Sequence, residues 1–164
     1  MIVMKRILSV FALLALVVFS GCATPNSDFF DAFREGYVAE VEGTLYGMPF
    51  SAKIEMGQQG QDVCAPATIT FYAPAEISGT VIARAANGAI TLTSGGASTG
   101  DMGGVGAALF SLFPTDGSVY ETKTTEQGRT RLICEGFELE FLSDGTPYSV
   151  KTGDVSATVV RWSA

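Results

Sequence analysis

The sequence predicts a mainly β protein with two short helices, in which an antiparallel meander is covered on its apolar side by the helices. Three observations predict this fold class. From residue 37 onward most segments alternate apolar and polar residues, which is the pattern of half-buried strands. Short turn signals such as Asn87-Gly88 separate these segments, so strands that follow one another pair antiparallel. Only residues 27–35 and 102–113 have helical spacing of apolar residues.

The first 21 residues are predicted to be an export signal. Lys5 and Arg6 precede a nearly unbroken apolar run over residues 7–19, and small residues follow it, as in signal peptides. The run has 13 residues, whereas a membrane-spanning helix needs roughly 20. A cleaved signal is therefore favoured over a retained anchor.

The end of this signal, Phe19-Ser20-Gly21-Cys22, resembles the lipobox of bacterial lipoproteins, although Phe19 replaces the commoner Leu. The resemblance implies that Cys22 is linked to diacylglycerol, becomes the first mature residue and holds the protein at a membrane outside the cytoplasm. In an envelope with two membranes this includes the outer one. Each buried methylene contributes about 0.8 kcal/mol, so two or three acyl chains such as palmitate anchor a protein stably. The alternative is an ordinary secretory signal that ends near a cysteine.

After the signal, residues 22–28 form a short polar tether and residues 29–164 a single domain. The 143 residues from Cys22 onward suffice for one core. They carry eight basic and 17 acidic side chains, a net charge of −9. Such an acidic body excludes the electrostatic footprint of a nucleic-acid-binding protein and does not attract anionic headgroups. The anchor at Cys22 is therefore the expected membrane contact.

With Cys22 assigned to lipid, Cys64 and Cys134 remain as an even pair. In an exported protein a disulfide between them is favoured. The spacing alone does not decide the pairing, and two buried free thiols are the alternative.

The first predicted element of the domain is a two-turn helix over residues 27–35. Ser27 or Asn26 caps its start and Gly36 ends it. Its aromatic residues share one side, which must be buried: Phe29, Phe30 and Phe33.

Nine or ten strands follow, nearly all connected locally. Asn87-Gly88 predicts a type I′ hairpin turn, because both central residues of that turn need positive φ. Gly136 is predicted to mark a bulge that bends one long strand rather than a separate turn. The predicted strands cover residues 37–46, 50–56, 67–72, 80–85, 89–93, 119–126, 129–134, 137–142, 148–151 and 155–162.

Residue types exclude most catalytic and metal chemistry. The chain has no histidine, which removes the usual serine triad, Cys–His pairs and most zinc sites. Glu138 and Glu140 share one face of a strand, about 7 Å apart, but acids that alternate with apolar residues are more simply a solvated face. Asp116-Gly117 and Asp144-Gly145 lie outside any calcium-ligand ladder. We expect no enzyme, no metal and no cofactor.

The stretch TGDMGGVGAALFSLFP, residues 99–114, contains the second predicted helix. Its glycines fit neither phosphate-binding spacing, and no lysine follows them. Asp101 is the predicted cap of a helix over 102–113 and Pro114 its stop. No charge occurs between Asp101 and Asp116, so we expect the segment to be enclosed on both sides or to lie against something apolar. A plain core helix and a mobile cover over a ligand pocket both remain open.

The order of these elements resembles the LolA-like lipoprotein carriers, including the lipid-anchored LolB, LppX and LprG types: an N-terminal helix, five strands through ATITFYAPAEISG, a central helix and a meander through SDGTPYSV. The resemblance implies a curved, open half-barrel that binds acyl chains or lipidated proteins between sheet and helices. The implied apolar lining is Phe29, Phe33, Val105, Leu109, Leu112 and Phe113. The alternative is a non-catalytic structural or protein-interaction lipoprotein whose core is closed by its own side chains.

Overall fold

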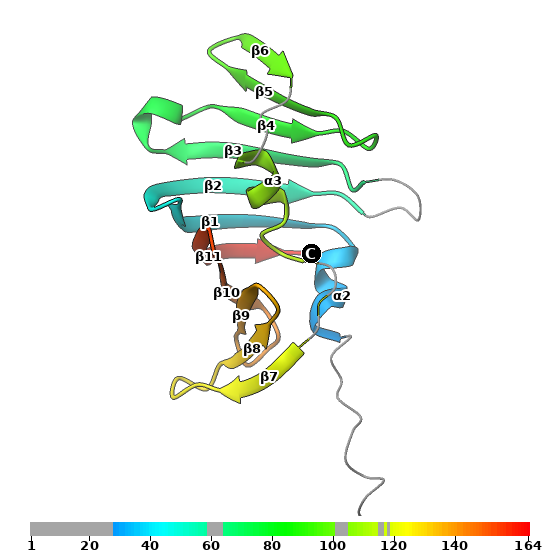
Figure 1. Ribbon diagram of the computed structural model, residues 1–164, viewed down its shortest axis with the longest axis vertical. Coiled ribbons are helices and arrows are strands. Elements are labelled where there is room, and N and C mark those ends of the chain that lie inside the picture. The colour runs from blue at the N-terminus through cyan, green and yellow to red at the C-terminus, as the bar shows by residue number, and fades with distance from the viewer. Residues whose placement is uncertain (1–27, 59–63, 101–104, 115–116, 118) are drawn as a thin grey trace, which may run out of the picture.

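Eleven strands form one antiparallel sheet that stays open (Figure 1). The computed structural model describes residues 28–58, 64–100, 105–114, 117 and 119–164. The helices are α2 (Asp28–Arg34) and α3 (Val105–Phe110), with a 3-10 turn η1 (Ala75–Ile77). The strands are β1 (Tyr37–Leu45), β2 (Met48–Met56), β3 (Ala67–Ala73), β4 (Val81–Arg84), β5 (Ile90–Ser94), β6 (Ala97–Gly100), β7 (Val119–Thr124), β8 (Thr130–Cys134), β9 (Phe137–Phe141), β10 (Pro147–Thr152) and β11 (Val155–Ser163).

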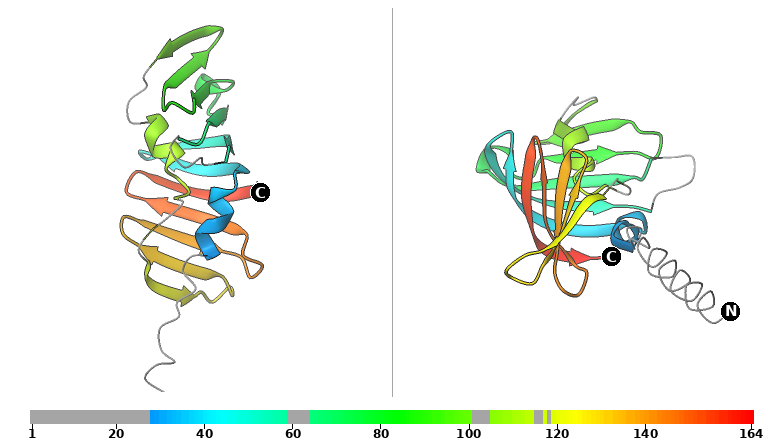
Figure 2. Two further views of the ribbon diagram at one scale, coloured as in Figure 1. Left: turned by 90° about the vertical axis from the view of Figure 1, so that its right-hand side faces the viewer. Right: turned by 60° about the horizontal axis from the view of Figure 1, so that its bottom comes forward.

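The meander is divided into two halves that meet at the centre of the sheet. Strands β1 to β6 run outward to one edge, and β7 to β11 run from the opposite edge back to the centre, where β11 pairs with β1. The chain between β6 and β7 therefore crosses from edge to edge. Helix α3 lies on this crossing, and it covers the concave face together with α2 (Figure 2). The predicted fold class, a mainly β open half-barrel covered by two short helices, is confirmed.

Alternation within the strands gives the sheet an apolar concave face and a polar outer face. In β1, Tyr37, Ala39 and Val41 are buried, while Glu40 and Glu42 take alternate positions on the outer face. The same pattern in the other long strands produces a single core. The aromatic side of α2 packs into this core as predicted, and Gly36 (φ 92°) ends that helix.

Bulges bend the sheet at four points, where one strand carries an extra residue. The bulge in β11 lies at Val160, because Glu40 pairs with Arg161 and the next residue of β1 pairs with Val159. It places Val159 and Trp162 on the same concave side. Bulges increase the local twist and curvature of a strand pair. The other extra residues are Tyr72, Tyr120 and Tyr148.

Two turn predictions need correction. Gly88 has φ 81°, but Asn87 does not have positive φ, so the β4–β5 turn is not type I′. Instead the Gly88 N–H donates to the Ala85 carbonyl at 2.9 Å, and only the glycine takes the left-handed position. Gly136 (φ 80°) lies in a two-residue turn between β8 and β9, so the bulge interpretation of this glycine is wrong.

Strand β6 was not predicted. It follows a two-residue turn at Gly95 (φ 57°) and Gly96 (φ 82°), which are the two positive φ values of a type I′ turn. Its sequence, ASTG, is exposed along its whole length. Without a buried side it has no hydrophobic alternation to reveal it.

Helix α3 is shorter than predicted and is enclosed on one side only. Of the predicted range 102–113, the structure describes residues from 105 onward, and the helix ends at Phe110 before a turn. Leu109 and Phe113 are buried, whereas Ala107 and Ser111 are exposed. The small side of the helix therefore faces solvent.

Candidate functional site

An apolar cavity of about 430 Å³ lies at one end of the concave face. It is enclosed by the β1–β2 turn, the η1 region, the inner side of β4 and β5, and the start of α3. Glu76 is the charged residue of its wall, and Tyr46 and Thr80 carry hydroxyl groups. The Thr80 hydroxyl donates to Ser94 Oγ at 3.0 Å. The wall is formed by Leu45, Tyr46, Met48, Pro49, Phe50, Phe71, Pro74, Glu76, Ile77, Thr80, Ile82, Leu92 and Val105.

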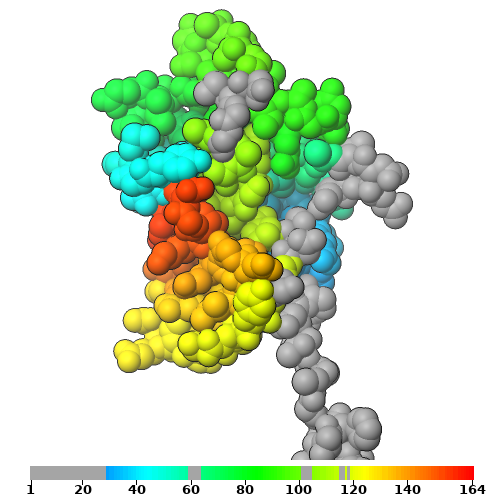
Figure 3. All heavy atoms as spheres, in the orientation of Figure 1, coloured from blue at the N-terminus to red at the C-terminus, as the bar shows by residue number. Residues whose placement is uncertain are grey.

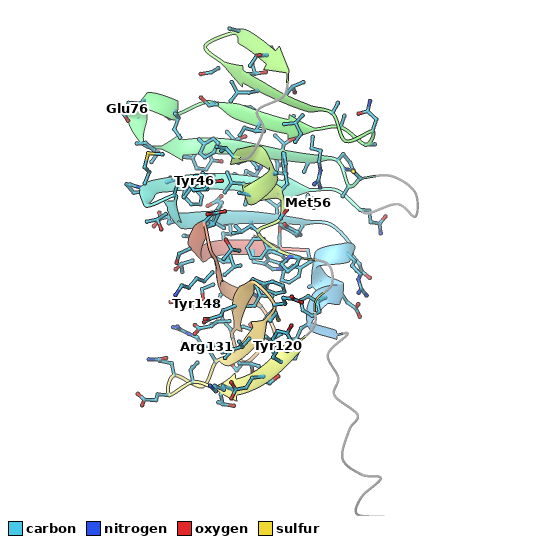
Figure 4. The ribbon with its side chains drawn as sticks, viewed as in Figure 1. Tyr46, Met56, Glu76, Tyr120, Arg131 and Tyr148 are labelled. Atoms are coloured by element: carbon cyan, nitrogen blue, oxygen red, sulfur yellow. The ribbon has the colours of Figure 1, made fainter. Side chains whose placement is uncertain are left out.

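Large apolar side chains form the exposed rim of this cavity. Tyr46 is 51% exposed, Met48 64% and Ile77 37%. Tyr46 has φ 50° and donates its backbone N–H to the Asp154 carbonyl at 2.8 Å, which fixes the β1–β2 turn against the β10–β11 turn. Figure 4 shows Tyr46 and Glu76 at this end of the sheet and Met56 on the other side of α3.

Of the six predicted lining residues, only Val105 lines this cavity. Leu109, Leu112 and Phe113 are buried and pack into the core, so they close the middle of the concave face. In Figure 3 the α3 segment occupies this middle region. The prediction placed the ligand space beneath α3, whereas the structure places the cavity beside the start of the helix.

The two predicted lining residues of α2 also belong to the core. The ring of Phe33 stacks on Phe113 with centroids 5.3 Å apart, and Phe29 lies 5.0 Å from Phe141. Tyr37 stacks on Trp162 at 4.6 Å beside this cluster. These rings fill the space that the resemblance assigned to a ligand.

The sequence contained a signal for the lining of the apolar cavity, but a prediction from strand alternation does not consider it. Met48 and Ile77 are apolar residues next to turns, in YGMPF and APAEI. Large apolar residues beside turn residues are unusual where a turn only faces water. Their positions on the cavity rim explain them.

A second, open groove of about 660 Å³ lies at the opposite end of β2 and β3. Its wall combines Tyr37, Met56 and Arg84 with a row of residues on the outer face of the sheet: Val38, Glu55, Thr68, Ala83 and Thr91. Arg84 projects from the same face of β4 as buried Ile82. Its Nε donates to the Ala65 carbonyl at 3.0 Å, and its guanidinium lies 4.8 Å from the centre of the Phe110 ring. This end of the concave face therefore carries a positive charge.

The favoured disulfide is absent from the structure, which contains Cys64 and Cys134 as free thiols. Cys64 is exposed next to the β4–β5 turn, where its N–H donates to the Ala86 carbonyl at 3.1 Å. Cys134 is buried in β8, on the other half of the sheet. Strand order separates the two sulfurs by several strands, which prevents a bond. Burial raises the pKa of the Cys134 thiol.

Glu140, one of the two acids that the sequence placed on one strand face, pairs with arginines. Glu140 accepts a hydrogen bond from Arg131 Nε at 2.7 Å and lies 3.7 Å from Arg129 Nη1. Arg129 in turn covers the ring of Tyr148 at 3.5 Å. The Glu140 carboxylate is thus neutralised by two arginines on the outer face. In the part of the chain that the structure describes, no cluster of three or more potential metal ligands occurs.

The signal peptide and Cys22 lie outside the described residues, so what was inferred about them remains a prediction. Within residues 28–58, 64–100, 105–114, 117 and 119–164, no helix has the length and hydropathy needed to cross a membrane.

Comparison with known proteins identifies the fold only. No protein-family model matches this chain, and no curated protein matches it in sequence. An uncharacterized conserved protein from Thermus thermophilus has a similar structure, with 13% identity, 83% of each chain covered and a TM-score of 0.51. MucB matches with 13% identity and a TM-score of 0.47 over 87% of this chain and 59% of its own. A putative outer membrane lipoprotein-sorting protein domain from Vibrio parahaemolyticus matches with 8% identity and a TM-score of 0.46 over 84% and 91%.

Proposed function

We propose that this chain is a membrane-anchored, extracytoplasmic lipoprotein without catalytic activity that binds an acyl chain in the apolar cavity. The cavity is the observation that carries the proposal. Its volume of about 430 Å³ falls in the range of small-molecule sites. An acyl tail offers nothing to hydrogen-bond, so it needs the almost entirely apolar wall that this cavity provides.

Anchoring and location rest on the sequence. The lipobox-like Phe19-Ser20-Gly21-Cys22 supports lipid attachment at Cys22. A net charge of −9 after the signal gives the body little attraction for anionic headgroups. Acyl chains on Cys22 would hold the protein where a lipid ligand is available.

Native mass spectrometry of a chain that begins at Ala23 tests acyl binding. All described elements lie between residues 28 and 164, so this chain keeps the whole sheet and both helices. We expect a mass increment from copurified acyl lipid or from added dodecanoate. A wild-type spectrum that shows only the bare chain after dodecanoate is added contradicts the proposal.

A matched pair of variants assigns the binding to the cavity. Leu92→Arg introduces a charge into the wall at a partly exposed position of β5, and we expect it to remove the lipid mass. Val160→Arg places the same charge on the outer face, where Val160 is exposed, and we expect it to keep the lipid. Thermal unfolding of both variants verifies that the sheet is intact.

The closed centre of the concave face favours a second candidate, a non-catalytic interaction lipoprotein. Leu109, Leu112 and Phe113 occupy the space beneath the crossing segment, so the outer polar face would make the functional contacts. This function predicts a bare-chain mass and a melting temperature that added dodecanoate leaves unchanged.

A further inference from the structure

Glu76 gives the otherwise apolar cavity a negative charge at its rim. It lies in η1 beside Ile77, and it is exposed in the cavity wall. An exposed glutamate is ionised at neutral pH, and its carboxylate accepts hydrogen bonds without donating any. A ligand head group at this rim therefore meets a negative group.

In the part of the chain that the structure describes, no cationic side chain balances Glu76. The sequence has eight lysines and arginines after Cys22, and all eight belong to the described residues. None of these eight lines the cavity, and the ion pairs within 4.0 Å between described residues do not include Glu76. The negative charge at the rim is therefore available to a ligand.

A second acidic residue lies next to the rim. Tyr46 donates its backbone N–H to the Asp154 carbonyl at 2.8 Å, so the β10–β11 turn that carries Asp154 is held against the rim. Asp154 is exposed, and it too is absent from the ion pairs between described residues. The net charge of −9 after the signal adds an attraction for cations at longer range.

The ring of Tyr46 offers a further contact for a cation. It is half exposed on the rim of the cavity, and Figure 4 shows Tyr46 and Glu76 at the same end of the sheet. The arginines that lie over aromatic rings among the described residues use Phe110 and Tyr148, which leaves the Tyr46 ring without a cation. Aromatic rings attract quaternary ammonium groups through their negative faces.

We propose that the apolar cavity binds an amphiphile with one acyl chain and a positively charged ammonium head group, which lies beside Glu76 and Tyr46 at the rim. This inference rests on the proposed function, because the acyl tail occupies the same cavity. The volume of about 430 Å³ is near the low end of small-molecule sites and suits a single tail. The ammonium gains an opposite charge and an aromatic face. A carboxylate head group at the same position would be repelled by Glu76.

Calorimetric titration of the chain that begins at Ala23 with dodecyltrimethylammonium, dodecanol and dodecanoate tests the proposal. The three probes share one tail and differ in the charge of the head, and each is used below its critical micelle concentration. We expect dodecyltrimethylammonium to bind at least about tenfold more tightly than dodecanoate, with dodecanol between them. Dodecanoate still binds through its tail. Raising the salt concentration from about 0.01 M to about 1 M shortens the Debye length from roughly 30 Å to roughly 3 Å and should reduce this ratio.

A matched pair of variants separates the rim from the general negative charge of the domain. Glu76→Gln and Glu126→Gln each remove one exposed carboxylate and give chains of equal net charge. Glu126 lies in the β7–β8 turn, at the opposite edge of the sheet. We expect Glu76→Gln to weaken dodecyltrimethylammonium binding about threefold and Glu126→Gln to leave it unchanged. Neither variant should change the dodecanol affinity.

Variants of Tyr46 test the aromatic contact. Tyr46→Leu keeps an apolar rim without the ring, and it should weaken dodecyltrimethylammonium binding about threefold while the dodecanol affinity stays the same. Tyr46→Phe keeps the ring and should retain the wild-type affinity. Both replacements place a Cβ at the same φ of 50°, and thermal unfolding of each variant verifies that the sheet is intact.

The outcomes distinguish this inference from the proposed function. An affinity for dodecyltrimethylammonium that does not exceed those for the other two probes overturns the ammonium assignment and leaves acyl binding intact. An equal loss in Glu76→Gln and Glu126→Gln also overturns it, because the general charge of the domain then explains the preference. Tetramethylammonium that binds with Glu76 dependence shows a site for the free cation and overturns the amphiphile assignment. Binding of none of the three amphiphiles overturns both the inference and the proposed function.

Discussion

Substitution of Leu109 tests whether α3 is a fixed part of the core or a mobile cover. Leu109 is 0% exposed, so Leu109→Ala loses the full transfer free energy of three carbon groups, about 2.4 kcal/mol at 0.8 kcal/mol each. The cavity that remains brings the expected loss in the free energy of unfolding to about 3–5 kcal/mol. For a domain of this size the melting temperature should fall by roughly 10 °C or more.

Urea unfolding followed by tryptophan fluorescence measures this loss. The chain contains one tryptophan, and Trp162 lies 5.6 Å from Phe113, directly after the α3 segment, and stacks on Tyr37. Its emission therefore reports the packing in question. Ser111→Ala, on the exposed side of the same segment, is the control and should change stability by less than about 0.5 kcal/mol. A loss below about 1 kcal/mol for Leu109→Ala would refute the reasoning, because it would mean that α3 detaches at little cost.

Three further predictions follow from single contacts. Gly43→Ala should abolish stable folding, measured by circular dichroism, because an added Cβ would lie 2.0 Å from the Ser156 carbonyl oxygen; a native spectrum contradicts this. In the native chain that begins at Ala23, iodoacetamide should label exposed Cys64 and spare Cys134, whose pKa is raised by burial, so a double label before unfolding is the opposite result. Burial raises the pKa of Tyr37 above its unfolded value near 10. The stability that depends on the protonated phenol is therefore complete below about pH 10 and is lost as the pH rises further. Tyr37→Phe should unfold at a higher pH than the wild type, and an unchanged pH of half-unfolding argues against this.

Local patterns predicted most of the sheet, because a strand with one buried face carries its own signature. The alternation of Tyr37, Ala39 and Val41 with polar residues is such a case. Strand β6 has four exposed small residues and hence no such signature. The β1–β11 pairing could not be predicted either, since it joins residues about 120 positions apart, and local sequence does not specify long-range partners.

The sequence did not predict the candidate site, because the site also depends on contacts between segments that are far apart in the chain. The helical arc of the central segment indicated which side chains would be buried, and Leu109 and Phe113 are buried. Burial alone does not distinguish a core residue from a ligand contact. The cavity instead depends on how the β1–β2 turn, η1 and α3 meet in space, and only Val105 was among the predicted lining residues.

The edge-to-edge crossing explains why the charge-free segment lies over the concave face, and why an apolar space remains beside it. A chain that leaves the sheet at β6 and re-enters at β7 must pass over the concave face, where a charged side chain would be costly to bury. Helix α3 is only six residues long and cannot cover eleven strands. It therefore seals the middle with Leu109 and Phe110 and leaves the apolar cavity beside its first residue, Val105, at one end of the concave face.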